Sequence, residues 1–315
     1  MTSGSSRNSW PNLADLDLLP TTDALQLWSQ VAGKVRLMLT PWINHSWHAT
    51  LYLSARGFTT GLVHAGARTF EIEFDLLDDV LRITVAGGKT QRVELAPQSV
   101  AAFYNAAMQA LGEVGLAVDI CPMPSEIPGA IAFTEDHAQR PYHADTARAY
   151  WRAMLQIHRV LQLFRSRFIG KCSPIHLFWG SFDLAVTRFS GREAPSHPGG
   201  MAHVPNAVAR EAYSHEVSSA GFWPGSGRGA SFYSYAYPAP PGFNDARVEP
   251  AAAAFDPKLG EFILSYDAVQ ASANPDEDLL SFLQSTYQAA ADLAHWDRAR
   301  LERPQGFFGR PPDGA

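Results

Sequence analysis

The strongest constraint on the fold is a regular alternation of apolar and acidic residues at positions 70–75. Phe70, Ile72 and Phe74 alternate there with Glu71, Glu73 and Asp75. This period of two residues is typical of a strand that buries one face and exposes the other. Asp78-Asp79 can form the next turn, residues 81–85 carry a return strand, and Gly87-Gly88 turns into residues 91–95. The segment therefore predicts consecutive hairpins in an antiparallel sheet.

Helical patterns precede and follow strand patterns along the chain. Apolar residues have helical spacing at residues 22–33, ending at Gly33, and at 99–111, 145–168 and 274–293. Further strands are predicted at residues 34–40, 48–54, 116–121, 175–189, 215–222, 231–237 and 261–266. Hairpins with helices at the ends of each segment indicate an α+β fold, with antiparallel sheets flanked by helices. Two similar helix–sheet–helix halves are one alternative, although no matching residues support a duplication.

A proline- and acid-rich segment at residues 122–141 separates the two halves. This composition is typical of a connector between subdomains. We therefore predict an N-terminal α+β subdomain at residues 1–121 and a C-terminal α+β subdomain at residues 142–303. Residues 304–315 are predicted to be a loose tail.

Composition argues against several classes of protein. The 315 residues carry a formal net charge of −6, whereas a nucleic-acid binder usually has a basic stripe. No run approaches the ~18 apolar residues of a membrane span, and residues 1–8 lack the apolar stretch of a secretory signal. The two cysteines, Cys121 and Cys172, are too few for a disulfide framework. We expect a protein of the reduced cytoplasm without a nucleic-acid or membrane partner.

Residues 176–245 hold the most informative cluster of side chains. Aromatic residues are dense there, and acids, arginines and histidines lie among them. Aromatic walls with a few placed polar groups are typical of small-molecule sites. We expect a pocket whose wall is formed by Trp179, Trp223, Tyr233, Tyr235 and Tyr237.

The polar residues of this zone suggest roles in such a pocket. A histidine near a carboxylate can act as a general acid or base near neutral pH, so His215, Asp183 and His176 are predicted to be catalytic. Arg188 and Arg192 are predicted to hold an anionic part of the ligand, because a guanidinium group suits carboxylates and phosphates. In the alternative interpretation, the aromatic rings fill the core and the polar groups form a buried network that fixes it.

Three histidines leave a metal site as a further alternative. His45 and His48 lie three residues apart, and His215 could complete a three-histidine site. His215-Glu216 begins like the HExxH zinc motif, but Ser219 stands where the second histidine is needed. No motif identifies a cofactor.

Several long segments of the sequence resemble one known family. They are Gly170 to Arg192, Arg210 to Gly225 and Phe232 to Pro238, together with Gly33 to Arg36, Asn44-His45 and Ala55 to Gly57. Through these segments, the chain resembles the DUF5996 family of bacterial proteins from Trp10 to about Glu302. The resemblance implies a single family over nearly the full length. It implies no activity and no catalytic residues, because that family is uncharacterised.

The sequence leaves three functions open. The first is an enzyme or enzyme-like protein that binds a small organic molecule, an anionic one if the arginines take part. The second is a non-catalytic ligand-binding or protein-interaction module, with a homodimer as one form. The third is a histidine-ligated, metal-dependent enzyme.

Overall fold

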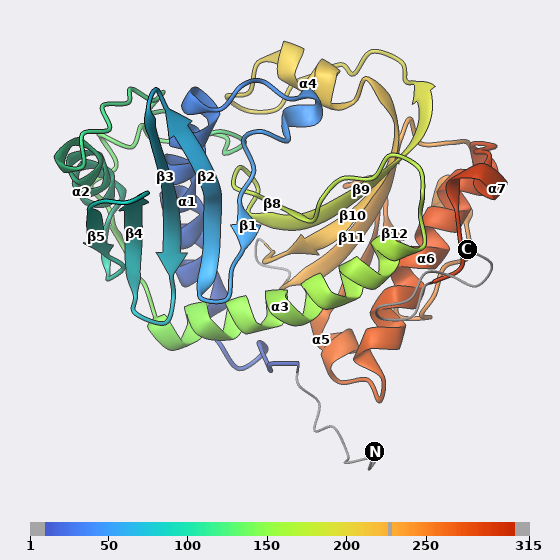
Figure 1. The fold of residues 1–315 in the computed structure, drawn as a ribbon. Coiled ribbons are helices and arrows are strands. Elements are labelled where there is room, and N and C mark those ends of the chain that lie inside the picture. The colour runs from blue at the N-terminus through green and yellow to red at the C-terminus, as the bar shows by residue number, and fades with distance from the viewer. Residues whose placement is uncertain (1–9, 226–228, 306–315) are drawn as a thin grey trace.

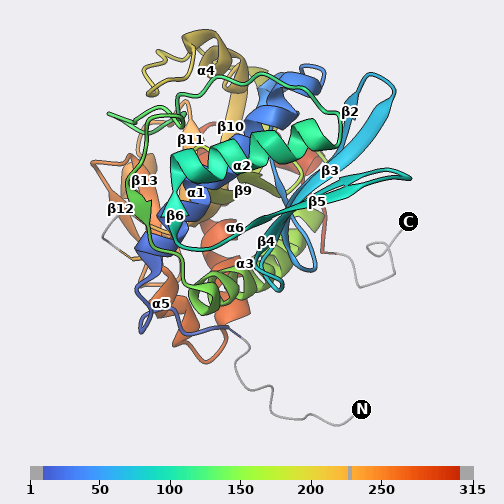
Figure 2. The same cartoon turned by 90° about the vertical axis from the view of Figure 1, so that its left-hand side faces the viewer.

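The computed structural model describes residues 10–225 and 229–305, so most of the predicted tail lies outside the described residues. In the first half, helix α1 (Leu18–Leu39) and the 3₁₀ turn η1 (Asn44–Ser46) precede an antiparallel sheet with the order β1-β2-β3-β4-β5. Its strands are β1 (Tyr52–Leu53), β2 (Gly57–Ala65), β3 (Arg68–Asp75), β4 (Val80–Val85) and β5 (Thr90–Glu94). Helix α2 (Val100–Glu113) follows and packs on α1 (Figure 2). The short strands β6 (Gln98–Ser99) and β7 (Gln139–Arg140) pair with each other.

The second half begins with helix α3 (Ala144–Ser166) and contains an antiparallel sheet with the order β12-β13-β11-β10-β9-β8. Its strands are β8 (His176–Phe178), β9 (Asp183–Glu193), β10 (His215–Trp223), β11 (Ser231–Tyr237), β12 (Ala254–Asp256) and β13 (Glu261–Ser265). The remaining elements are α4 (Asn206–Ala212), η2 (Phe243–Asp245), α5 (Tyr266–Gln270), α6 (Pro275–Leu293) and α7 (Arg298–Leu301). Helices α3 and α6 contact one side of this sheet, and α4 lies near η1 on the other side (Figure 1).

The hairpins that the alternating pattern predicts are present in register. Phe70, Ile72 and Phe74 of β3 pair with Val85, Ile83 and Leu81 of β4. The three β3 side chains are 1–2% exposed, so the apolar face of the alternation is the buried one. The predicted α+β class with antiparallel sheets flanked by helices is confirmed, and each half runs helix, sheet, helix.

The strand predicted at residues 34–40 is wrong, because α1 continues to Leu39. Val31 and Val35 lie one helical turn apart and are both buried, so the apolar pattern belongs to a helix face. Gly33 lies inside this helix instead of ending it. A Cβ atom at Gly33 would lie 2.3 Å from the Trp179 ring, and glycine therefore lets the indole pack directly on the helix. Residues 116–121 form no strand either.

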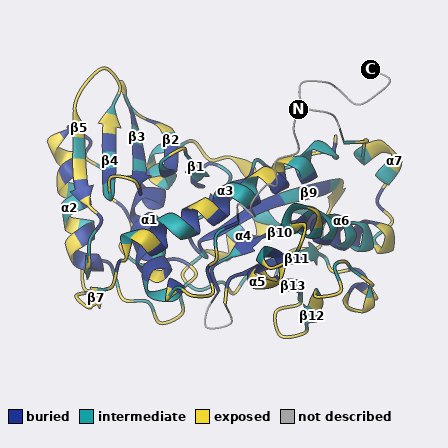
Figure 3. Cartoon of the chain, turned by 90° about the horizontal axis from the view of Figure 1, so that it is seen from below, coloured by how far each residue is buried: buried dark blue, intermediate teal, exposed yellow. Residues whose placement is uncertain are grey.

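The two sheets share one core. The backbone groups of Leu51 and Leu177 exchange two hydrogen bonds of 2.9 Å, which join the first sheet to the second. Helix α3 runs beneath both sheets (Figure 1), and one buried cluster extends from Phe74 to Phe222. Exposed residues gather on the outer turns and hairpin ends (Figure 3). The division into subdomains at residues 122–141 remains a prediction.

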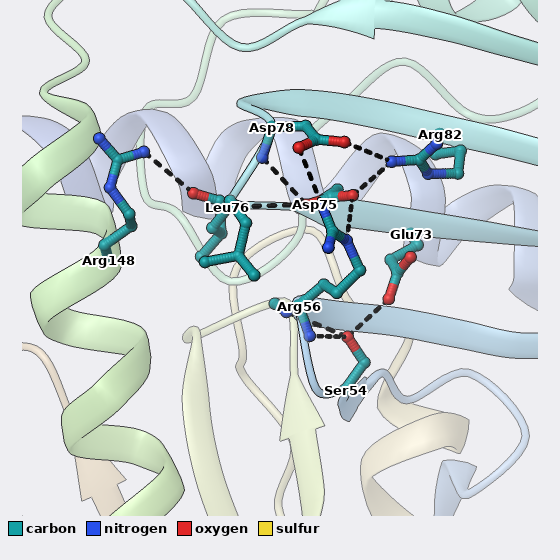
Figure 4. A network of polar contacts seen from close by, with 10 residues as sticks. Ser54, Arg56, Glu73, Asp75, Leu76, Asp78, Arg82 and Arg148 are labelled. Carbon is teal, nitrogen blue, oxygen red and sulfur yellow. Dashed lines mark hydrogen bonds and ion pairs between the residues drawn. The ribbon is translucent and has the colours of Figure 1, made fainter.

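A polar network at the end of β3 connects the first sheet to α3 (Figure 4). The buried carboxylate of Asp75 accepts hydrogen bonds from Arg56 Nε (2.5 Å) and from Arg82 Nη2. Burial alone would raise the pKa of Asp75, but these hydrogen bonds outweigh it and lower the pKa to about 2. Arg148 of α3 donates to the carbonyl oxygen of Leu76 at 3.1 Å, which ties the helix to the same corner.

None of the described helices combines the length and the apolar character that crossing a membrane requires. Cys121 and Cys172 are both free thiols. The cytoplasmic location expected from the cysteine content remains a prediction.

Candidate functional site

A cavity of about 590 Å³ lies on the face of the second sheet that is turned away from α3 and α6. Strands β9, β10 and β11 form its floor. The C-terminal end of α1, the η1 turn, helix α4 and the segments around residues 125 and 203 form its walls. A volume of this size is typical of a small-molecule site.

The floor consists of alternate residues of three paired strands. Thr187 of β9 lies opposite Ser219 of β10, which lies opposite Tyr235 of β11. Because side chains of paired strands share a face at these positions, all three enter the cavity. The Thr187 and Ser219 hydroxyls are 2.9 Å apart, and the Tyr235 hydroxyl lies 2.8 Å from that of Tyr213.

Two carboxyl groups lie together at the polar end of the cavity. Asp183, at the start of β9, accepts a hydrogen bond from Ser181 Oγ at 2.6 Å and another from the hydroxyl of Tyr233. Burial raises the pKa of Asp183, and these two hydrogen bonds oppose the rise. Glu126 is hydrogen-bonded to Ser181 as well. Ser181 therefore connects the two carboxyl groups.

The pKa of Glu126 is strongly raised. Glu126 is an exposed residue of the cavity lining, yet its carboxyl group lies close to Gly180, Ser181 and Asp183. Burial of the carboxyl group, together with the negative charge of Asp183, raises the pKa of Glu126 to about 7, although the hydrogen bond from Ser181 works against the rise. A carboxyl group with this pKa exists in both protonation states at neutral pH.

Helix α1 positions the loops that carry these groups. The Gln30 side chain binds both backbone groups of Ser125. Its Oε1 accepts a hydrogen bond from the Ser125 N–H at 2.7 Å, and its Nε2 donates one to the Ser125 carbonyl at 3.1 Å. Gln26 Nε2 donates to the carbonyl of Gly180 at 2.6 Å. Because one rigid helix holds both loops, it fixes the distance between Glu126 and Ser181.

The backbone around the carboxyl pair is adapted to this close approach. A Cβ atom at Gly180 would lie 2.1 Å from Glu126 Oε1, so a side chain at this position would displace the carboxyl group from where it lies. Glu126 and Phe182 have φ angles of 65° and 61°, a left-handed conformation that non-glycine residues seldom adopt. Strain of this kind concentrates at functional sites.

Aromatic rings form the apolar wall. Trp179 donates its Nε1–H to the carbonyl of Ala49 at 2.6 Å, which fixes the indole plane at the cavity. Met38 and Trp42 also contribute to the lining while their side chains are 58% and 53% exposed. Large apolar side chains are therefore accessible where the cavity meets the surface.

His45 also lines the cavity, and its hydrogen bonds define its protonation. Nδ1 lies 2.8 Å from the carbonyl of Ala212 and Nε2 lies 2.8 Å from Lys171 Nζ. Nδ1 is then the donor and Nε2 the acceptor, which makes the ring neutral. Burial and the positive charge of Lys171 lower the pKa of His45, and the hydrogen bond to Ala212 opposes them.

Of the ten residues predicted to be catalytic or to bind the ligand, four line the cavity: Trp179, Asp183, Tyr233 and Tyr235. The other six lie outside its lining. Tyr237 packs behind the wall, where its ring contacts Tyr213 and its hydroxyl donates to Pro195. Trp223 ends β10 opposite Ser231.

Arg188 lies on the opposite face of the sheet from the cavity. Its guanidinium group is fully buried, with its centre 3.5 Å from the ring centroid of Phe164 and 4.3 Å from that of Tyr287. Nη2 donates to the carbonyl of Phe164. Arg188 lies five positions after Asp183 in β9, and side chains an odd number of positions apart point to opposite faces of a strand. Arg188 therefore points away from the cavity that Asp183 lines, and it cannot anchor an anion there as predicted.

Arg192 is also remote from the cavity. It forms a 2.7 Å ion pair with Glu216 and donates to the carbonyl of Ala294 at 2.6 Å, at the C-terminal end of α6. Both arginines therefore contact protein groups, and neither contributes a positive charge to the cavity.

The two histidines that were predicted to be catalytic do not reach the carboxyl pair. His176 is fully buried between Trp47, Tyr52 and Phe178, and neither ring nitrogen has a hydrogen-bond partner. Burial, reinforced by nearby arginine charges, lowers its pKa to about 3, so this ring is neutral. His215 Nδ1 lies 3.0 Å from Ser214 Oγ, outside the cavity lining.

The structure does not support the three-histidine metal site. The rings of His45 and His215 are 6.0 Å apart, but both nitrogens of His45 already have partners. His48 Nδ1 lies 3.2 Å from the carbonyl of Ile43. Within residues 10–225 and 229–305, no group of three or more histidine, cysteine or acidic side chains is arranged to hold a metal ion.

Sequence reasoning missed Glu126, Ser181 and Tyr213. Glu126 lies in the segment interpreted as a connector, more than fifty residues from Asp183, and no local pattern marks it. The left-handed backbone and the contact with Gly180 are visible only in the folded chain.

The fold and the cavity define an α+β protein with an aromatic-walled, ligand-sized cavity on one face of an antiparallel sheet. The chain belongs to the Family of unknown function (DUF5996), whose model matches residues 10–303. The resemblance predicted from the sequence is thereby confirmed over nearly the full length. Neither a curated protein nor a solved structure matches the chain.

Proposed function

We propose that the protein binds a small organic molecule in the cavity on the second sheet and that Glu126 and Asp183 act on it as an acid–base pair. The observation that carries the proposal is the pair of carboxyl groups, connected by Ser181, at the polar end of an aromatic-walled cavity. Perturbed carboxyl groups in a cavity of this kind are typical of functional sites.

The hydrogen bonds suggest how the pair divides its roles. Ser181 has a single hydroxyl hydrogen, which it donates to Asp183. The same hydroxyl group also donates to the ionised form of Glu126 and lowers its pKa, so the two carboxyl groups share it, and a ligand atom can exchange a proton with Glu126. With a pKa of about 7, Glu126 can give or accept a proton near neutral pH. Burial raises the pKa of Asp183, and the hydrogen bonds from Ser181 and Tyr233 favour its ionised form against that burial.

The ligand inferred here differs from the anion expected from the sequence. Arg188 and Arg192 lie outside the cavity lining, and the ionisable groups at its polar end are acids. The proposal therefore retains the small molecule and the aromatic wall, and it replaces histidine and arginine with carboxyl groups as the acting residues.

A cavity-filling variant tests the proposal. Ala212 of α4 lines the cavity, whereas Ala207 on the same helix is exposed and outside it. We expect compounds from a metabolite library to raise the melting temperature of the native protein and of Ala207→Trp. The same compounds should have no effect on Ala212→Trp, because the indole fills their site. Equal responses in both variants would refute binding in this cavity.

A non-catalytic interaction module is the second candidate, and exposed apolar residues favour it. Met38, Trp42 and Ile43 are 45–58% exposed and lie close together in the chain. If this surface joins two copies into a homodimer, Ile43→Ser should convert a dimer to a monomer by light scattering. Ile43 does not line the cavity, so ligand responses should persist in that variant.

A further inference from the structure

The carboxyl pair lacks a positive partner. The side-chain partners of Glu126 and Asp183 are the hydroxyl groups of Ser181 and Tyr233. Within residues 10–225 and 229–305, neither carboxyl group forms an ion pair with a lysine, arginine or histidine. Glu261, at the start of β13, feels the charge of Asp183 but lies outside the cavity lining. The polar end of the cavity therefore holds two carboxyl groups for which the described part of the chain provides no counter-ion.

Three cationic side chains of the surrounding elements are held by uncharged groups. Lys34 donates to Ser125 Oγ at 3.1 Å, and Lys171 lies 2.8 Å from Nε2 of His45. Arg36 donates to the carbonyl of His48 at 2.7 Å. His203 lines the cavity from the opposite segment and is exposed. None of these interactions neutralises the carboxyl pair.

The wall of the cavity is suited to a positive charge. Its rings come from Trp42, Trp47, Phe178, Trp179, Phe189, Tyr213, Tyr233 and Tyr235. The faces of such rings attract cations, most strongly in tryptophan. Two ammonium groups of the protein already lie over rings of this wall: Lys34 is 5.5 Å from the Trp179 centroid, and Lys171 is 5.3 Å from that of Trp47.

We infer that the cavity recognises an organic cation, an amine or ammonium compound with an apolar body. The ammonium group is held at Glu126 and Asp183, and the apolar body packs against the tryptophan and tyrosine rings. The inference rests on the proposed function, since it assigns the chemical class of ligand for the same cavity. It explains why acids without counter-ions and aromatic rings line one space.

Matched ligands that differ only in charge test the inference. We would measure the binding of tryptamine, the neutral alcohol tryptophol and the anion indole-3-propionate by titration calorimetry at pH 8, and repeat the series with phenyl and naphthyl bodies. We expect the amines to bind at least ten times more tightly than the alcohols and the anions to be the weakest. Alcohols or anions that bind as tightly as amines would overturn the inference and leave the proposed function intact. A series in which no member binds would also overturn the inference, whereas the proposed function is contradicted only if the library compounds fail to distinguish Ala212→Trp from Ala207→Trp.

A matched pair of variants locates the charge. Glu126→Gln keeps the shape of the side chain and removes its charge, so it should weaken amine binding about 10- to 100-fold, because a charge-assisted hydrogen bond is lost. Binding of the alcohol should change less than twofold. Glu261→Gln is the control, because Glu261 lies on the same sheet but outside the cavity lining. Equal losses for amine and alcohol in Glu126→Gln would show that the carboxyl group acts through its shape, which would overturn the inference.

Discussion

Substitution of Glu126 by glutamine should stabilise the free protein at alkaline pH. Burial and the charge of Asp183 raise the pKa of Glu126 from its ordinary value of 4.5 to about 7. Because the folded state keeps this proton longer than the unfolded state, stability is lost as the pH rises from 4.5 through 7. A glutamine carries no charge at any pH and avoids this loss.

The magnitude follows from the difference between the two pKa values. Taken fully, it corresponds to at most about 3 kcal/mol of lost stability above pH 8. Glu126 is an exposed residue of the cavity lining, and solvent screens its interactions. We therefore expect Glu126→Gln to raise the free energy of unfolding by about 1–2 kcal/mol at pH 8.5. At pH 4.5 the difference should be below about 0.5 kcal/mol, because both chains are then largely neutral at this position.

Urea unfolding followed by tryptophan fluorescence can measure this difference at both pH values. Glu135→Gln is the control, since Glu135 is exposed in the same segment, at residues 122–141. Its effect should be small and alike at pH 4.5 and pH 8.5. A Glu126→Gln variant that is less stable than the native protein at pH 8.5 would refute the reasoning, because the ionised carboxylate would then be a favourable group. A gain that is equal at both pH values would refute it as well.

Two further predictions concern residues outside the cavity. Asp75→Asn should lower the free energy of unfolding by about 2 kcal/mol at pH 7, because it removes the ionised partner of Arg56 and Arg82. The low pKa of Asp75 stabilises the fold above pH 3.8 and loses this effect as the pH falls through about 2, so unfolding curves of the two proteins should converge in acid. Arg188→Lys should lower the free energy of unfolding by about 1–3 kcal/mol, because an ammonium group cannot stack its plane on Phe164 and Tyr287. Its cavity ligands should bind as in the native protein, and a selective loss of their binding in calorimetry would contradict the position assigned to Arg188.

Local patterns predicted much of the secondary structure. The period of two at residues 70–75 identified β3 and its pairing with β4, because that alternation is incompatible with a helix that buries one face. Helical spacing identified α2, α3 and α6 to within a few residues. The same reasoning failed at residues 34–40, where Val35, Leu37 and Leu39 fit an alternation but form the end of α1. Short apolar runs fit both periods, and packing against the rest of the chain selects one.

The sequence alone determined the antiparallel α+β class, the family and the aromatic character of the second sheet. The aromatic and polar residues of the second sheet also identified Trp179, Asp183, Tyr233 and Tyr235 as candidate site residues. The tertiary structure decided which face encloses a cavity, and it placed Arg188 on the other side. It also brought Glu126 from the middle of the chain to Asp183, with Gln26 and Gln30 of α1 holding the loops in place. Local patterns report which residues are buried, whereas the pairing of distant charged groups depends on how helices and loops pack over a sheet.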